Sequence, residues 1–147
     1  MFKIDETKAT GKLTVEIKDK DGKVKDTREL TNLVVSDGLD FIASRMKDAT
    51  ATAMSHMAIG TGSTAAASGD SALGTEAARQ ALTSTTVNNN AVSYVASFAA
   101  GTGTGAITEA GVLNAASSGT LLCRTVFSVV NKGASDSMTI TWTITIS

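Results

Sequence analysis

The chain has 147 residues and a net charge of −1, which suits a single domain spanning residues 1–147. The near-neutral charge argues against nucleic acid or a membrane surface as the main partner, because binding to phosphate groups requires a surplus of Lys and Arg, and no apolar run is long enough for a membrane-spanning helix. The single cysteine, Cys123, excludes an internal disulfide and suits a reducing compartment such as the cytoplasm.

The first predicted elements are a β-hairpin at residues 12–30 and a short α-helix. Apolar residues alternate with polar ones from Leu13 to Ile17, which is the period of a half-buried strand. Asp21-Gly22 is a strong hairpin-turn signal, and the return strand follows it. Apolar residues at helical spacing then predict a helix at about 36–48, with Ser36 as its N-cap.

The rest of the chain predicts short strands separated by turns and loops rich in Gly, Ser, Ala and Asn. Expected strands lie at 56–59, 81–87, 92–98, 107–114, 121–130 and 139–146, with one helical turn at 75–79. In the last strand, isoleucines and Trp142 occupy one face and threonines the other. Seven or eight strands and one helix predict a mainly β fold, an antiparallel β-sandwich or jelly roll.

Charged residues are distributed unevenly along the chain. Twenty lie in positions 1–48, whereas positions 49–147 hold seven: Asp70, Glu76, Arg79, Glu109, Arg124, Lys132 and Asp136. A long segment with so few charges is not an ordinary solvated surface. We therefore divide the domain into a charged N-terminal arm or hairpin (1–30) and a β-sandwich body (31–147), and we expect much of the body's surface to contact other protein subunits. An exposed edge strand at either end of the chain is expected to pair with a neighbour's sheet.

Residue types that perform catalysis do not form a recognisable set in this sequence. His56 is the only histidine and Cys123 the only cysteine, so neither a zinc ligand set nor a nucleophile–base pair is predicted. We interpret His56 as a structural side chain and Cys123 as a buried small residue. The alternating charges at 18–28 are interpreted as a solvated hairpin face or, alternatively, as a surface that docks onto a complementary partner.

Two glycine patterns and three acidic residues are further candidates for ligand sites. Gly60-x-Gly62 and Gly101-x-Gly103 match a relaxed dinucleotide fingerprint, but they lack the strand–turn–helix context that binds a pyrophosphate, so we interpret both as flexible loops. No calcium-loop spacing is present, and the acidic residues Asp70, Glu76 and Asp136 are widely separated. We therefore predict no catalytic, cofactor-binding or metal-binding residue, no cofactor, no small-molecule substrate and no enzyme activity.

Several runs of the sequence resemble small structural proteins of tailed-bacteriophage virions. They are MSHMAIGTGSTAAASGDSALGTEAAR at 54–79, ITEAGVLNA at 107–115 and TVFSVVNKGASDSMTITWTITIS at 125–147, with TNLVVSDGLDFIASRM at 31–46 as a similar lead-in. The members that coat heads are jelly-roll capsid cement, or decoration, proteins. The resemblance implies a protein that is made in the host bacterial cytoplasm, sits on the outer capsid surface of the virion and bridges neighbouring capsomers. Its implied partners are the major capsid protein and itself, as a homodimer or homotrimer.

Two other functions remain open at this point. Runs similar to these also occur in phage tail fibre and baseplate proteins, which makes a structural component of the tail the alternative location. A carbohydrate-binding module on a sandwich fold is a third hypothesis, from a different class of protein. Such modules present exposed aromatic platforms, whereas most aromatic residues of this chain fall at inward-facing strand positions.

Overall fold

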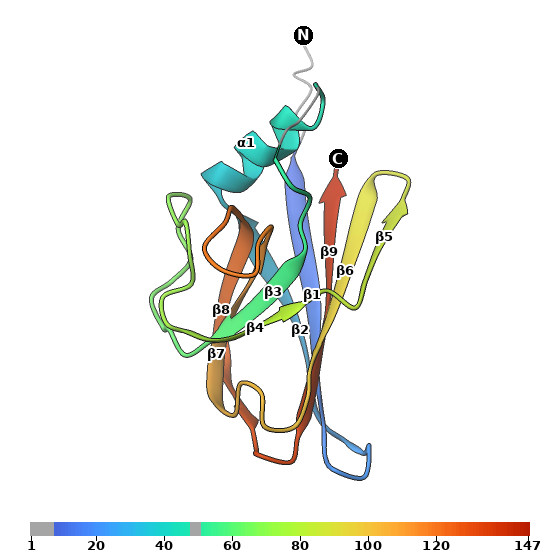
Figure 1. Ribbon diagram of the computed structural model, residues 1–147, viewed down its shortest axis with the longest axis vertical. Coiled ribbons are helices and arrows are strands. Elements are labelled where there is room, and N and C mark those ends of the chain that lie inside the picture. The colour runs from blue at the N-terminus through green and yellow to red at the C-terminus, as the bar shows by residue number, and fades with distance from the viewer. Residues whose placement is uncertain (1–7, 48–50) are drawn as a thin grey trace, which may run out of the picture.

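The computed structural model describes residues 8–47 and 51–147, and strands dominate this part of the chain. The elements in chain order are β1 (Ala9–Lys18), β2 (Val24–Val34), α1 (Ser36–Ser44), β3 (His56–Gly60), β4 (Glu76–Ala81), β5 (Ser84–Asn88), β6 (Ala91–Phe98), β7 (Gly105–Leu113), β8 (Leu121–Lys132) and β9 (Ser137–Ile146). The strands form one curled antiparallel sheet in the order β4-β3-β7-β8-β2-β1-β9-β6-β5 (Figure 1).

The sheet folds over at β2, so that its two halves face each other. β2 pairs with β1 along most of its length, but its strand pairing with β8 involves only Leu33 and Val34. One layer therefore contains β1, β9, β6 and β5, and the other contains β8, β7, β3 and β4. The predicted class, mainly β with antiparallel strands in a sandwich or jelly roll, is confirmed.

The N-terminal hairpin is confirmed, and its strands belong to one layer of the sheet. β1 pairs with β2 on one side and with β9 on the other. In the connecting turn, Gly22 has a φ of +81°, a backbone conformation that favours glycine. The carboxylate of Asp19 accepts hydrogen bonds from the backbone N–H groups of Asp21 and Lys23, which closes the turn.

The C-terminal strand is also confirmed, but neither terminal strand is a free edge. β9 lies between β1 and β6 over its whole length. Ile140, Trp142 and Ile144 are buried, as the alternation predicts. The expectation that a terminal segment offers an exposed edge is wrong, because both β1 and β9 are paired on both sides. The strands at the ends of the sheet order are β4 and β5.

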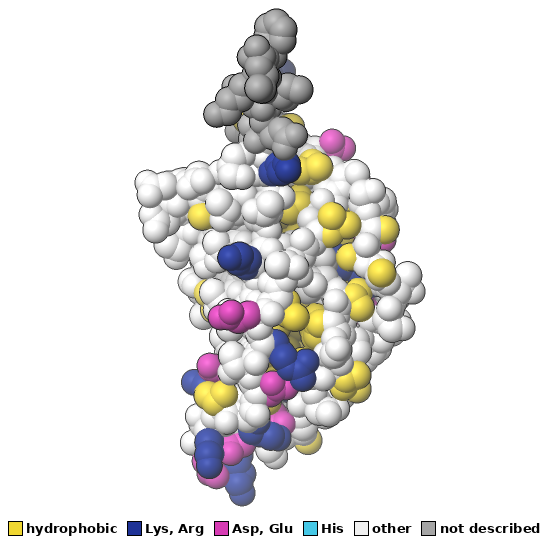
Figure 2. Space-filling model, turned by 180° about the vertical axis from the view of Figure 1, so that it is seen from behind, with side chains coloured by type: hydrophobic (Ala, Val, Ile, Leu, Met, Phe, Trp, Pro, Cys, Tyr) yellow, Lys and Arg dark blue, Asp and Glu magenta, His cyan; other side chains and the backbone are white. Residues whose placement is uncertain are grey.

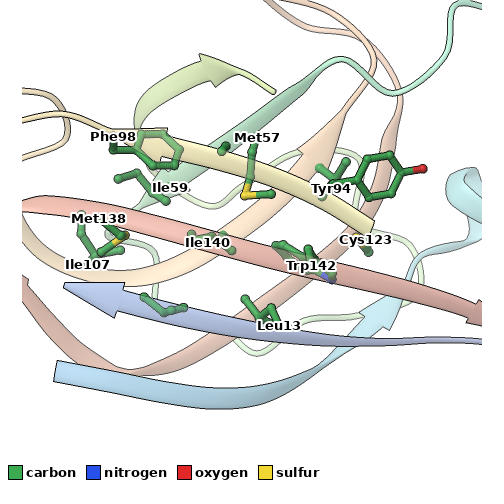
Figure 3. Close-up of a cluster of buried hydrophobic side chains, with 14 of the residues drawn as sticks. Leu13, Met57, Ile59, Tyr94, Phe98, Ile107, Cys123, Met138, Ile140 and Trp142 are labelled. Carbon is green, nitrogen blue, oxygen red and sulfur yellow. The ribbon is translucent and has the colours of Figure 1, made fainter. Parts of the chain in front are cut away.

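The hydrophobic core lies between the two layers. Side chains from both halves of the sheet meet there, including Leu13, Met57, Ile59, Phe98, Ile107, Ile140 and Trp142 (Figure 3). Trp142 and Phe98 are the largest fully buried side chains. A sequence with few aromatic residues thus places its largest rings at the centre of the interface between the layers.

Helix α1 is shorter than expected and has a different N-cap. It covers Ser36–Ser44, and its N-cap is Val35, which makes no side-chain capping bond. The predicted end at Asp48 lies outside the described residues. Gly38 explains how the helix packs, because a Cβ at this position would overlap the carbonyl oxygen of Leu122 in β8. No helix among the described residues is long and apolar enough to cross a membrane.

The expected helical turn at 75–79 is wrong, since these residues belong largely to strand β4. β4 pairs with β3, with Met57 opposite Gln80 and Ile59 opposite Ala78. The EAAR run favours a helix locally, but pairing with a buried strand overrides that weak preference. The expected strand at 81–87 corresponds to the end of β4 and most of β5.

Candidate interaction surface

The two residues with the strongest catalytic potential, His56 and Cys123, lie on strands β3 and β8. His56 is the first residue of β3, and its Nδ1 atom lies 2.8 Å from the hydroxyl oxygen, Oγ, of Ser55. Cys123 is confirmed as a buried residue, and burial raises the pKa of its thiol far above the ordinary value. Because the thiolate is the reactive form, Cys123 is not poised as a nucleophile. Within the ranges 8–47 and 51–147, no three His, Cys, Asp or Glu side chains come together as a metal site requires.

The second glycine pattern lies in a loop, as expected, whereas the first begins at the last residue of a strand. Gly60 ends β3 and leads into the loop 61–75, which contains no helix. Gly103 lies between β6 and β7 with a φ of +67°. Gly62 has a packing role, because a Cβ there would overlap the carboxylate of Glu109. The first pattern therefore reflects the close approach of a loop to a buried side chain.

A buried ion pair between Glu109 on β7 and Arg124 on β8 holds the loop 61–75 against the sheet. The Nη2 atom of Arg124 lies 3.0 Å from Oε1 of Glu109, and the two residues are 2% and 0% exposed. The Glu109 carboxylate also accepts hydrogen bonds of 2.6–2.7 Å from backbone N–H groups, those of Gly62, Gly74 and Thr75. All four partners of this carboxylate are donors, so the buried negative charge is fully compensated.

Arg124 extends the same cluster further into the loop. Its Nη1 donates to Asp70 at 2.8 Å, and its Nη2 donates to the carbonyl oxygen of Thr64 at 3.0 Å. The loop 61–75 is therefore anchored at both ends and in the middle. Sequence reasoning missed this cluster, although one signal existed: Glu109 and Arg124 are isolated charges within otherwise apolar strands. Such charges are rarely buried unless they are paired.

The protonation of Glu109 couples this cluster to pH. Burial alone would raise the pKa of its carboxyl group, but hydrogen bonds from Thr75, Gly74, Arg124 and Gly62 outweigh burial and lower the pKa below its ordinary value. A group whose pKa is lower in the folded state stabilises the fold at pH values above its unfolded pKa. That contribution is lost as the pH falls through the folded pKa.

We expect the protein to lose stability in acid, and Glu109 to account for part of the loss. Urea unfolding of the wild type and of Glu109→Gln, measured from pH 7 down to about pH 3, provides the comparison. The free energy of unfolding should fall more steeply with decreasing pH in the wild type, because only the wild type must protonate Glu109. Equal slopes in the two proteins would contradict this assignment.

A second buried cation, Lys132, lies at the opposite end of β8 from Leu121. It is 1% exposed, and its Nζ atom donates to the carbonyl oxygens of Ala99 and Asp136 at 2.9 and 2.8 Å. The Asp136 carboxylate accepts from Lys25 at 2.9 Å and from the backbone of Gly133. Lys132 therefore joins two loops at the lower end of the sandwich, and Asp136 connects the body to the hairpin.

Burial removes further charges from the surface of the body, which already has few charged residues in its sequence after position 48. Four of its seven charged residues after position 48 are buried, namely Glu109, Arg124, Lys132 and Asp136. Of the others, Asp70 pairs with Arg124, and Glu76 pairs with Arg79 at 2.6 Å. Many of the remaining surface charges lie near the tip of the β1–β2 hairpin, at the lower end of the molecule, and others lie further along the hairpin and on α1 (Figure 2). The body between this tip and α1 presents mainly Ser, Thr, Gly, Ala and backbone.

An apolar groove of about 340 Å³ lies between α1 and the layer that ends in β5. Its walls include Phe41 and Ile42 from the helix, Val87 from β5 and Ile144 from β9. Two aromatic residues, Phe41 and Tyr94, line this groove, whereas Phe98, Phe127 and Trp142 are buried and are not among its walls. The groove and the neighbouring strand edge are thus suited to contact with apolar protein side chains.

Comparison of this chain with known protein families, with curated proteins and with solved structures finds no match.

Proposed function

We propose that this chain is a structural protein without catalytic activity, a capsid cement protein that binds the outer surface of a bacteriophage head and bridges neighbouring capsomers. Its partners are then the major capsid protein and further copies of itself. The observation that carries the proposal is the scarcity of charge on the surface of residues 51–147, where Asp70, Glu76 and Arg79 are the charged side chains that are not buried. This surface arises because most of the few charges in the body hold its own loops and strands together.

Physical reasoning supports a role in protein contact. The centres of protein–protein interfaces are depleted in charged residues, and the surface of the body has the same character. Small polar side chains lose little conformational entropy when a neighbour covers them. Many modest contacts, repeated over a particle surface, gain strength through multivalency.

The sequence resemblance supports the same proposal from a different direction. Its most specific run, 54–79, includes β3, the loop 61–75 and the first residues of β4. Glu109, which lies in the second run at 107–115, accepts the hydrogen bonds that hold this loop. Two of the four runs that carry the resemblance are thus joined directly in the fold.

Quantitative mass spectrometry of purified phage particles tests the proposal. Capsid cement predicts a copy number close to that of the major capsid protein, and loss of the chain should make heads sensitive to heat and low ionic strength. Absence of the chain from purified particles would reject a virion role altogether. Heads that keep their full resistance without it would reject the cement role.

The alternative is a structural component of the tail, in a fibre or a baseplate. It is favoured by the similarity of the same sequence runs to tail proteins, and it requires the same contact surface. A tail component predicts few copies per particle and labelling at the tail. Electron microscopy of particles that carry a tagged copy therefore separates the two locations.

A further inference from the structure

Strand β5 leaves one side of the layer open. It pairs with β6 from Ser84 to Asn88, and among the described residues it has no strand on its other side. Backbone N–H and C=O groups along such an edge form a template for another strand. All five residues of β5 are exposed.

The β5 edge lacks the features that usually prevent strands from associating. Charged side chains, prolines and bulges are the common protections of an edge. No charged residue occurs between Arg79 and Glu109, the chain has no proline, and the pairing of β5 with β6 contains no register shift. A neutral, regular edge of this kind accepts a partner strand without electrostatic repulsion.

Two other strand stretches that are paired on one side only carry charged side chains. β4 carries the ion pair between Glu76 and Arg79, and Arg79 also donates to the carbonyl oxygens of Ala115 and Ser118. The open stretch of β2 carries Arg28, which binds Asp26 and the carbonyl oxygens of Ser128 and Val129. The β5 edge therefore differs from both of these in being uncharged.

The two faces of β5 match the faces of the layer it extends. Thr86 lies opposite Ser93, which in turn lies opposite Thr143, so this row belongs to the outer polar face. Val87 lies on the inner side, lines the apolar groove and is 70% exposed. A strand added beside β5 would cover Val87 and continue the layer along the groove.

We propose that the β5 edge binds the β5 edge of a second copy, in an antiparallel pair related by a two-fold axis. If the two-fold axis is perpendicular to the layer, the Ser/Thr face of one copy continues into the Ser/Thr face of the other. Val87 of each copy then lies on the same side of the joined sheet. Because the strand is uncharged, no like charges meet. This inference rests on the proposed function, in which many copies of the chain lie close together, and it identifies the surface through which copies join.

Paired charge variants test this contact. Ser84→Lys with Thr86→Lys places cations on the exposed outer face of β5, where two copies would repel each other. Sedimentation equilibrium up to about 100 µM should show a dimer for the wild type and at least about tenfold weaker association for the lysine variant. The variant Ser84→Asp with Thr86→Asp should behave in the same way, and an equimolar mixture of the two should recover the dimer.

A control variant separates the edge from a general effect of charge. Thr139→Lys with Thr141→Lys adds the same charge at the same spacing to β9, which is paired on both sides. This control should dimerise like the wild type, and circular dichroism should show that all the variants are folded. A wild type that stays monomeric over the whole range overturns the inference, as does a dimer that the β5 variants leave unchanged.

The dimer and the proposed function fail in distinguishable ways. If the chain is absent from particles but forms a dimer in solution that the β5 variants weaken, the proposed function fails and the β5 contact stands. If the wild type is monomeric but is found on particles in many copies, the β5 contact with a second copy fails. In that case the edge is available to a strand of another virion protein.

Discussion

Replacing Glu109 with alanine is expected to lower the free energy of unfolding by about 3–5 kcal/mol, because it removes the buried counter-ion of Arg124 and leaves the partly exposed Asp70 as the carboxylate paired with it. The variant would also remove the acceptor for the backbone N–H groups of Gly62, Gly74 and Thr75. Each buried donor without a partner adds its own desolvation cost. Urea unfolding at neutral pH, followed by tryptophan fluorescence of Trp142, measures the change.

The ion pair between Glu76 and Arg79 provides a matched control. Glu76 is exposed and Arg79, although mostly buried, keeps its bonds to the carbonyl oxygens of Ala115 and Ser118, so Glu76→Ala should cost about 1 kcal/mol or less. The comparison isolates burial, because both variants remove a glutamate bound to an arginine. If the two variants were equally stable, the cluster around Glu109 would not be the anchor of the loop 61–75.

Replacing Trp142 with alanine is expected to destabilise the fold by a similar amount, about 3–5 kcal/mol. Trp142 is fully buried and lies opposite Leu13 on β1 and Tyr94 on β6 (Figure 3). Its removal would leave a large cavity between the layers, which the paired strands on both sides of β9 prevent from closing. Chemical or thermal unfolding followed by circular dichroism measures the loss, since the variant has no tryptophan.

Two further variants in β9 test whether the loss of stability comes from the cavity left by Trp142. The indole Nε1 of Trp142 has no hydrogen-bond partner in the described part of the chain, so Trp142→Phe loses packing but no hydrogen bond. It should cost about 1–2 kcal/mol. Thr141→Ala changes the exposed face of the same strand and should stay within about 0.5 kcal/mol of the wild type. A large effect of Thr141→Ala would show that the strand itself, and not the cavity, is the sensitive feature.

Local patterns predicted those elements whose signals are contained in a few neighbouring residues. The β1–β2 hairpin follows from alternation and the Asp21-Gly22 turn, and the turn before β6 follows from three asparagines, of which Asn89 has a positive φ. β9 follows from an alternation that continues over ten residues. In each case the period of the side chains and the conformation of the turn are properties of the local chain.

The errors occurred where a distant partner decides the structure. The EAAR run is locally compatible with a helix, but β3 pairs with it as a strand. The helix expected from Ser36 begins without a side-chain cap because its position depends on the contact between Gly38 and β8. Local preferences of this size are small compared with the pairing of a whole strand or the packing of a helix on a sheet.

The amino-acid sequence by itself determined a mainly β chain, a charged hairpin, a body with few charges and the inward face of β9, because composition and side-chain period are local properties. Only the tertiary structure decided that Glu109, Arg124 and Lys132 are internal and that β5 is the open, uncharged edge. The physical reason is that burial and strand pairing depend on residues far apart in the chain. The sequence around an isolated charge in an apolar strand does not show whether the charge faces water or protein. Likewise, the sequence of a strand does not show whether it pairs on one side or on both.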